Sequence, residues 1–92
     1  MHMRVTRTRQ DPTRFDENLP LVLEAAEAVR QLPGNQSIVI VGDRTTGEAL
    51  AVSTWDTDDH ARFSRDLLGE LPGRLQAVGV QIDPPQIFEG MG

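Results

Sequence analysis

The chain has 92 residues, a formal net charge of −5 and no cysteine. This length fits one domain near the small end of what a single hydrophobic core supports, so we expect residues 1–92 to form one unit. The absence of cysteine excludes disulfides, thiolate metal ligands and iron–sulfur clusters. The acidic balance argues against a nucleic-acid partner, which would require a basic face.

The longest apolar runs in the chain are Ile38–Val41 and Ala49–Val52. Both are far shorter than the ~20 apolar residues that cross a bilayer. The N-terminus also lacks the apolar core of a signal peptide. We therefore expect a soluble, cytoplasmic protein without a membrane partner.

The first third of the chain is predicted to form a strand and a helix. Apolar and polar residues alternate over Met3–Arg9, which indicates a strand that Pro12 ends. Pro20 stands where a helix can begin, and apolar residues then recur at helical spacing as far as Leu32-Pro33-Gly34. A single helix that starts at Pro12 and is kinked at Pro20 is the alternative, and the sequence leaves both open.

A β-hairpin is predicted next, with a tight turn at Asp43–Gly47 between the two apolar runs. Neither run alternates between apolar and polar residues, and a strand that is apolar on both sides is covered on both sides. In a chain this short, helices can cover only one face of the sheet. The other face therefore requires a partner, and we expect a second copy of the chain.

The remainder is predicted to form one helix and a last strand. Thr57 can cap the helix, apolar residues at helical spacing continue it to Leu71, and Pro72-Gly73 closes it. Ala77–Ile82 reads as the last strand, with Gln86–Glu89 as its extension or as an arm. The order β-α-β-β-α-β, with right-handed crossovers, predicts an α+β, ferredoxin-like fold in which a four-stranded antiparallel sheet carries both helices on one face.

Several segments resemble the dimeric α/β-barrel proteins, and more narrowly the antibiotic-biosynthesis-monooxygenase-like group. They are D-R-T-T-G (Asp43–Gly47), V-S-T-W (Val52–Trp55), D-T-D-D (Asp56–Asp59), L-P-G (Leu32–Gly34) and G-V-Q-I-D-P-P-Q-I-F-E (Gly79–Glu89). The resemblance spans nearly the whole chain and rests on fold motifs. It implies that two ferredoxin-like subunits pack sheet against sheet as a dimeric α/β barrel, each with a pocket between its sheet and its helices.

The resemblance also implies a function, namely binding of a small molecule and cofactor-independent monooxygenation of an aromatic or polyketide-like substrate. The alternative is a non-catalytic dimer of the same fold that binds a ligand or has a regulatory role. The haem-degrading branch has an Asn on the first strand and a Trp inside the second helix. Here the predicted first strand has no Asn and the predicted second helix has no Trp, so this branch is disfavoured. The quinone-forming branch places Trp, Asn, Tyr and Arg around a phenolic substrate. Trp55 and the arginines of the first strand could match this pattern, but the chain has no Tyr. We expect no metal, flavin or haem.

Three residues are candidates for catalysis. Trp55 could stack on a planar substrate, although a lone tryptophan at a strand end more often anchors the core. His60 could act as a base, or it could be a surface residue in the first turn of a helix. Arg4, with Thr6 and Thr8 on the same side of the first strand, could line a pocket and pair with a substrate carboxylate or phenolate. A salt bridge at the surface or between subunits is the alternative for Arg4.

Overall fold

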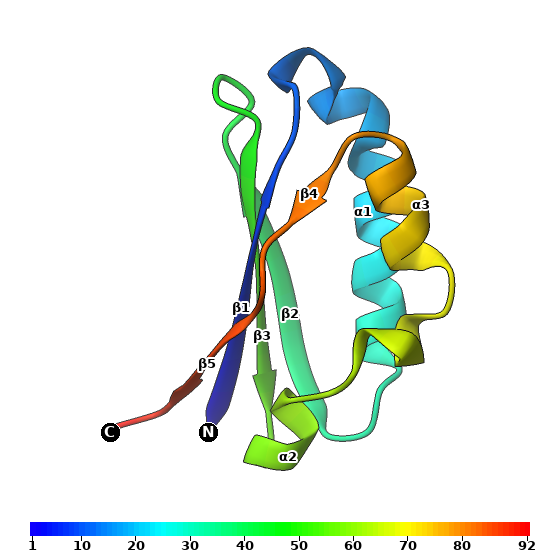
Figure 1. The fold of residues 1–92 in the computed structure, drawn as a ribbon. Coiled ribbons are helices and arrows are strands. Elements are labelled where there is room, and N and C mark those ends of the chain that lie inside the picture. Colours follow the sequence, from blue (N-terminus) through cyan, green and yellow to red (C-terminus); the bar gives the residue numbers. More distant parts are fainter.

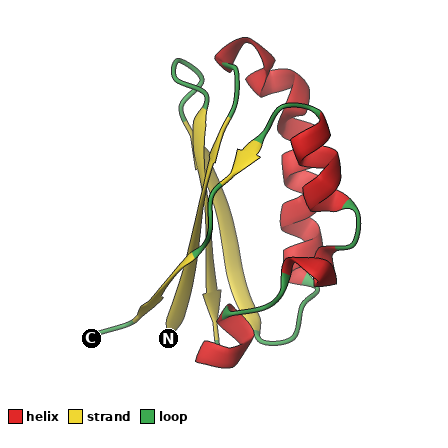
Figure 2. Ribbon diagram, viewed as in Figure 1, coloured by secondary structure: helices red, strands yellow, loops and turns green.

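The computed structural model describes residues 1–92, which form one antiparallel sheet with helices packed along one face (Figures 1 and 2). The strands follow the order β2-β3-β1-β4, and β5 also pairs with β1. Their bounds are β1 (His2–Arg9), β2 (Asn35–Gly42), β3 (Glu48–Trp55), β4 (Gln81–Ile82) and β5 (Gln86–Glu89). This arrangement confirms the predicted α+β, ferredoxin-like fold.

Both edges of the sheet are irregular. At one edge β4 and β5 pair with opposite ends of β1 and are separated by Asp83-Pro84-Pro85, so together they form one interrupted edge strand. At the other edge the register of β2 against β3 shifts between Asn35 and Ser37. The predicted last strand over Ala77–Ile82 was too long. Ala77 belongs to a helix, and a strand cannot begin until the chain has passed Gly79, whose φ is +89°.

The first helix, α1, runs from Phe15 to Arg30 and contains Pro20. A 3-10 turn at Pro12–Arg14 precedes it, and the Asp11 carboxylate caps that turn by accepting a hydrogen bond from the Thr13 N–H. The helix therefore begins before Pro20, in keeping with the single-helix alternative rather than with a start at Pro20.

The prediction of one helix from Thr57 to Leu71 was wrong. Thr57 caps a helix as expected, but this helix, α2 (Asp58–Ala61), is a single turn. A 3-10 turn follows at Arg65–Leu68, capped by Ser64, and a separate helix, α3 (Leu71–Ala77), comes after it. Pro72 lies in the first turn of α3, where a proline N–H is not needed, so Pro72-Gly73 opens a helix instead of closing one.

The core lies between α1 and the sheet. Its buried residues are Ala26, Val29, Ile38, Trp55 and Ala61. Only 13 of the 92 residues are buried in the single chain, which is little internal core for a domain of this size.

The opposite face of the sheet carries no helix (Figure 1). Val5, Val52 and Val39 stand opposite one another across three strands on this face. Val39 and Phe88 are about half exposed there, at 56% and 50%. The predicted two-sided apolar character of the hairpin strands is therefore present, with one side bare in the isolated chain. None of the helices is long and apolar enough to cross a membrane.

Candidate functional site

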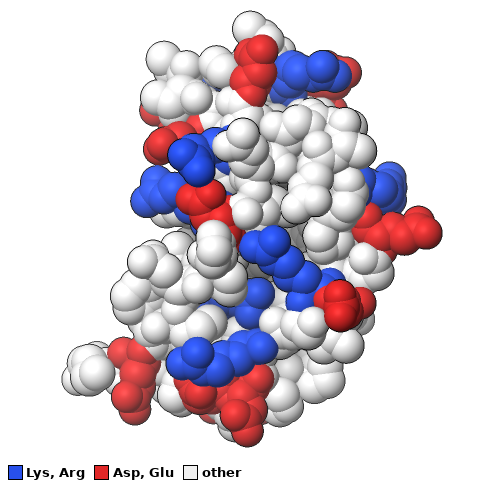
Figure 3. Space-filling model, in the orientation of Figure 1, with Lys and Arg blue, Asp and Glu red and all other residues white.

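A cavity of about 110 Å³ lies between the sheet and the helices. Its wall is mainly apolar and comes from the first three strands, α1 and α3. The polar residues that line it are Arg4, Thr6, Thr8, Ser53 and Arg65. The space-filling view shows arginine side chains in the middle of this side of the molecule, at a hollow between the sheet and the helices (Figure 3).

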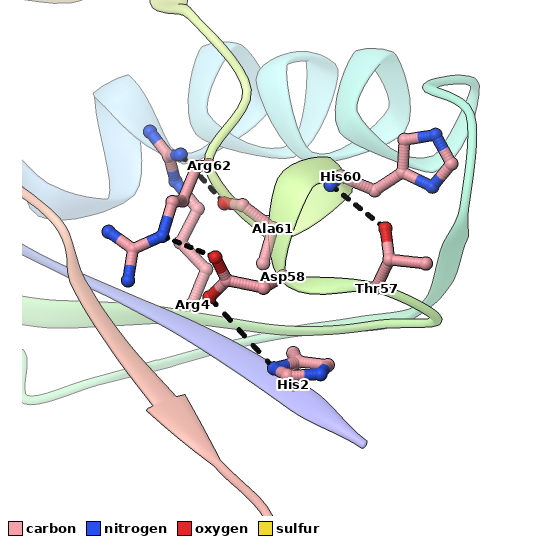
Figure 4. A network of polar contacts seen from close by, with 7 residues as sticks. All are labelled: His2, Arg4, Thr57, Asp58, His60, Ala61 and Arg62. Atoms are coloured by element: carbon pink, nitrogen blue, oxygen red, sulfur yellow. Dashed lines mark hydrogen bonds and ion pairs between the residues drawn. The ribbon is translucent and has the colours of Figure 1, made fainter.

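Arg4 reaches from β1 under the break between α2 and the following 3-10 turn (Figure 4). Its Nη1 group donates hydrogen bonds to the carbonyl oxygens of Ala61 (2.9 Å) and Phe63 (3.0 Å). A continuous helix would use these carbonyls internally, so the break leaves them free to accept from Arg4. The guanidinium carbon also lies 3.8 Å from the centre of the Phe63 ring, within the range of a cation–π contact.

The Arg4 side chain is a buried cation, since the residue is only 6% exposed. Burial, and then the neighbouring positive charge of Arg65, lower the pKa of Arg4 to about 10. Arg4 therefore stays protonated at neutral pH and places a positive charge at the wall of an apolar cavity. Of the three predicted site residues, it is the one that the structure brings to the cavity. Thr6 and Thr8 line the cavity beside it, which confirms the alternation predicted for this strand.

Trp55 is fully buried and does not line the cavity. Its indole Nε1 donates a hydrogen bond to Ser53 Oγ at 2.8 Å, and its ring packs 5.2 Å from that of Phe63, centre to centre. The Ser53 hydroxyl in turn donates to the Arg4 carbonyl oxygen at 3.4 Å. Trp55 therefore supports the cavity wall from behind.

His60 lies on the side of α2 that faces away from Arg4 (Figure 4). Its Nδ1 is 2.7 Å from the Asp56 Oδ1, and this hydrogen bond lowers the pKa of the Asp56 carboxyl. The ring sits against Gly34, where an added Cβ would overlap it. His60 does not line the cavity, and no group of three or more His, Asp or Glu side chains could hold a metal ion.

Three solved structures that cover the chain almost completely have the same architecture. A Deinococcus radiodurans protein proposed to be an antibiotic biosynthesis monooxygenase is 17% identical, with a TM-score of 0.81, and the match covers 100% of this chain and 94% of that one. A Nitrosomonas europaea protein with the same proposed activity is 11% identical, with a TM-score of 0.77 and full coverage of both chains. SnoaB, a cofactor-independent oxygenase from Streptomyces nogalater, is 15% identical, with a TM-score of 0.72 and coverage of 99% and 93%.

This chain has the antibiotic biosynthesis monooxygenase fold. The resemblance seen in the sequence is thereby confirmed at the level of the fold. No protein-family model and no curated protein matches the sequence itself.

Of the polar cavity residues in this antibiotic biosynthesis monooxygenase fold, Ser53 and Arg65 were not predicted as site residues. Arg65 lines the cavity, and its Nη2 donates to the backbone carbonyl of Asp83 at 2.8 Å. The sequence placed it on a continuous helix, where nothing distinguished it from other charged residues. The signal that could have found it is Ser64, a good cap residue that marks the start of a new turn.

Replacing Trp55 with phenylalanine is expected to lower the free energy of unfolding by about 1–2 kcal/mol, because most of the aromatic burial is kept while the Ser53 hydroxyl loses its donor. Urea denaturation measures this loss. Ligand affinity of the folded variant should be unchanged, because the indole does not reach the cavity. A variant of wild-type stability that has lost ligand binding would show that Trp55 contacts the ligand.

Proposed function

We propose that this chain is a cytoplasmic, homodimeric α/β-barrel protein that binds a small aromatic molecule and oxidises it without a cofactor. The observation that carries the proposal is the apolar cavity with the buried Arg4 guanidinium at its wall. A protein of the same fold, SnoaB, is described as a cofactor-independent oxygenase. Such a site suits a phenolic substrate, whose ring would pack on the apolar wall while its oxygen faces the cation.

The reaction we propose converts a phenol and O2 into a quinone and water. Loss of the phenolic proton gives a phenolate whose ring carbon is rich in electrons. This carbanion passes one electron to O2, and the radical pair combines into a carbon–oxygen bond. The peroxide anion takes up the proton that the phenol lost, and the hydroperoxide then eliminates water together with the hydrogen of the same ring carbon, so one oxygen atom stays as the quinone carbonyl. The substrate supplies all four electrons, and no external reductant is consumed.

The protein's contribution is to hold the ring, exclude water and stabilise negative charge. We assign the charge stabilisation to Arg4, because a phenolate in the cavity would face its guanidinium. Trp55 supports the wall behind Ser53 and is assigned no step. His60 points away from the cavity and is assigned no step.

The dimer we propose forms through the bare face of the sheet. Covering the row of valines on this face, of which Val39 is 56% exposed, would remove apolar surface from water. In a two-fold dimer, the valine row of one copy would pack against the valine row of the other. Sedimentation equilibrium at micromolar concentration is expected to show a dimer, and a monomer alone would contradict this part of the proposal.

The catalytic part is tested with electron-rich phenols, beginning with orcinol, in isotopically labelled O2. We expect O2 uptake without added metal, flavin or haem, unaffected by a chelator, and one labelled oxygen atom in each quinone. Binding without O2 uptake would instead support the non-catalytic, ligand-binding alternative. Haem is the control ligand, since a tight complex that degrades haem in the presence of a reductant would overturn the proposal.

A further inference from the structure

The arginines of this chain fall into two groups. Seven of the nine form an ion pair with a carboxylate, and these are Arg7, Arg9, Arg14, Arg30, Arg44, Arg62 and Arg74. Arg4 and Arg65 form none, and both line the cavity. No Asp or Glu side chain lines it. In a protein with a net charge of −5, the cavity therefore holds two positive charges without a counter-charge.

The two guanidiniums are only partly satisfied by the protein. Arg4 donates through Nη1 alone, to the carbonyls of Ala61 and Phe63, and Arg65 donates through Nη2 alone, to the carbonyl of Asp83. A guanidinium has five N–H donors, so the Nε groups and one terminal nitrogen of each side chain have no protein acceptor. The two cations also lie close enough for the charge of Arg65 to lower the pKa of Arg4. An anion bound by both guanidiniums would relieve this repulsion and accept hydrogen bonds from the free N–H groups.

The rest of the cavity limits what that anion can be. Val22, Ala25, Ile40, Leu68 and Leu75 contribute to a wall without further charge. The volume of about 110 Å³ is close to the ~150 Å³ of an engineered apolar cavity that binds benzene. The space therefore suits one ring rather than several. A planar carboxylate matches the fork of a guanidinium and brings a single negative charge.

We infer that the ligand is a single-ring aromatic carboxylate whose carboxylate lies between Arg4 and Arg65. This inference rests on the proposed function, since it names the substrate class of the same cavity. It narrows the polyketide-like expectation to one ring. The proposed oxidation then requires a ring hydroxyl ortho to the carboxylate, so that the Arg4 guanidinium can face the phenolate oxygen as well as the carboxylate.

The inference is tested by calorimetric titration of the whole protein with benzoate. Benzamide is the neutral probe of the same shape, phenol is the probe without a carboxylate, and inorganic phosphate is the probe without a ring. We expect benzoate to bind more tightly than each of the other three by roughly tenfold to a hundredfold, the effect of a hydrogen bond to a charged group. Equal affinity of the wild-type protein for benzoate and benzamide would overturn the inference. Tighter binding of phenol or phosphate than of benzoate would overturn it as well.

A matched pair of variants locates the anion. Arg65→Gln is expected to weaken benzoate binding by roughly tenfold to a hundredfold while leaving the affinity for benzamide unchanged. Arg62→Gln is the control, because Arg62 is paired with Asp58 and does not line the cavity, and it should change neither affinity. Unchanged benzoate binding in Arg65→Gln would overturn the assignment of Arg65.

The outcomes separate this inference from the proposed function. If benzoate binds tightly but no phenol causes O2 uptake, the proposed ligand class stands and the proposed oxidation is rejected. Turnover of phenols in a protein that does not prefer benzoate to benzamide would keep the oxidation and reject the ligand class.

Discussion

Replacing Val39 with aspartate is expected to convert the proposed dimer into a monomer. Val39 lies in the apolar row of the bare sheet face and is 56% exposed in the single chain, so the monomer tolerates a carboxylate there. In a sheet-to-sheet dimer the same carboxylate would be buried without a partner. Each such buried charge costs about 3–5 kcal/mol. A two-fold dimer holds two of them, so the dimer dissociation constant is expected to rise by roughly ten thousandfold or more.

Sedimentation velocity over a micromolar concentration series measures this change. Leu23→Asp is the matched control, because Leu23 is also an apolar residue that is 50% exposed but belongs to α1, away from the bare face. The control is expected to sediment as wild type. If Val39→Asp remains a dimer, or if both variants dissociate, the interface does not lie on the bare face of the sheet.

Replacing Gly47 with alanine is expected to lower the free energy of unfolding by about 3 kcal/mol or more. Gly47 ends the hairpin turn with φ +82°, and its carbonyl accepts a hydrogen bond from the Gln10 N–H at 3.1 Å. An added Cβ would overlap the Gln10 carbonyl oxygen, which is backbone and cannot swing aside. The backbone strain at positive φ costs about 1–2 kcal/mol, and separating the two loops adds the remainder.

Gly79→Ala is the control for the strain alone. Gly79 has a similar φ of +89°, but a Cβ added there would meet no atom within 4 Å. Urea denaturation should therefore show a loss of about 1–2 kcal/mol for Gly79→Ala and a clearly larger loss for Gly47→Ala. Equal losses in the two variants would mean that the contact between Gly47 and Gln10 contributes nothing to stability.

The fold was largely predictable because its signals are local. The hairpin has apolar runs on both sides of a turn that ends in glycine, and this pattern depends on neighbours in the sequence alone. The segment after Thr57 was mispredicted because apolar residues keep a helical spacing through Ser64 and up to Pro72. The helix nevertheless ends at Ala61. The carbonyls that a longer helix would have used accept hydrogen bonds from Arg4, which is more than fifty residues away in the sequence.

The candidate site was only partly predictable, because part of it depends on contacts between residues that are far apart in the sequence. The alternation along β1 was enough to place Arg4 with Thr6 and Thr8, because side chains on a strand share a face at every second residue. Its burial, and the arrival of Arg65 at the same cavity, both depend on the break in the second helical segment. A sequence interpreted as one continuous helix could not bring Arg65 to face β1.

The interrupted edges of the sheet decide how these chains can aggregate. An unbroken edge strand offers a row of free N–H and C=O groups that can recruit further chains into a fibre. Here one edge is broken by Pro84 and Pro85, which lack an N–H, and the other carries the register shift between Asn35 and Ser37. Growth by adding strand to strand is therefore disfavoured at both ends of the sheet. In the dimer proposed above, association would take place through the face instead, and a two-fold pair would leave no matching surface for a third copy.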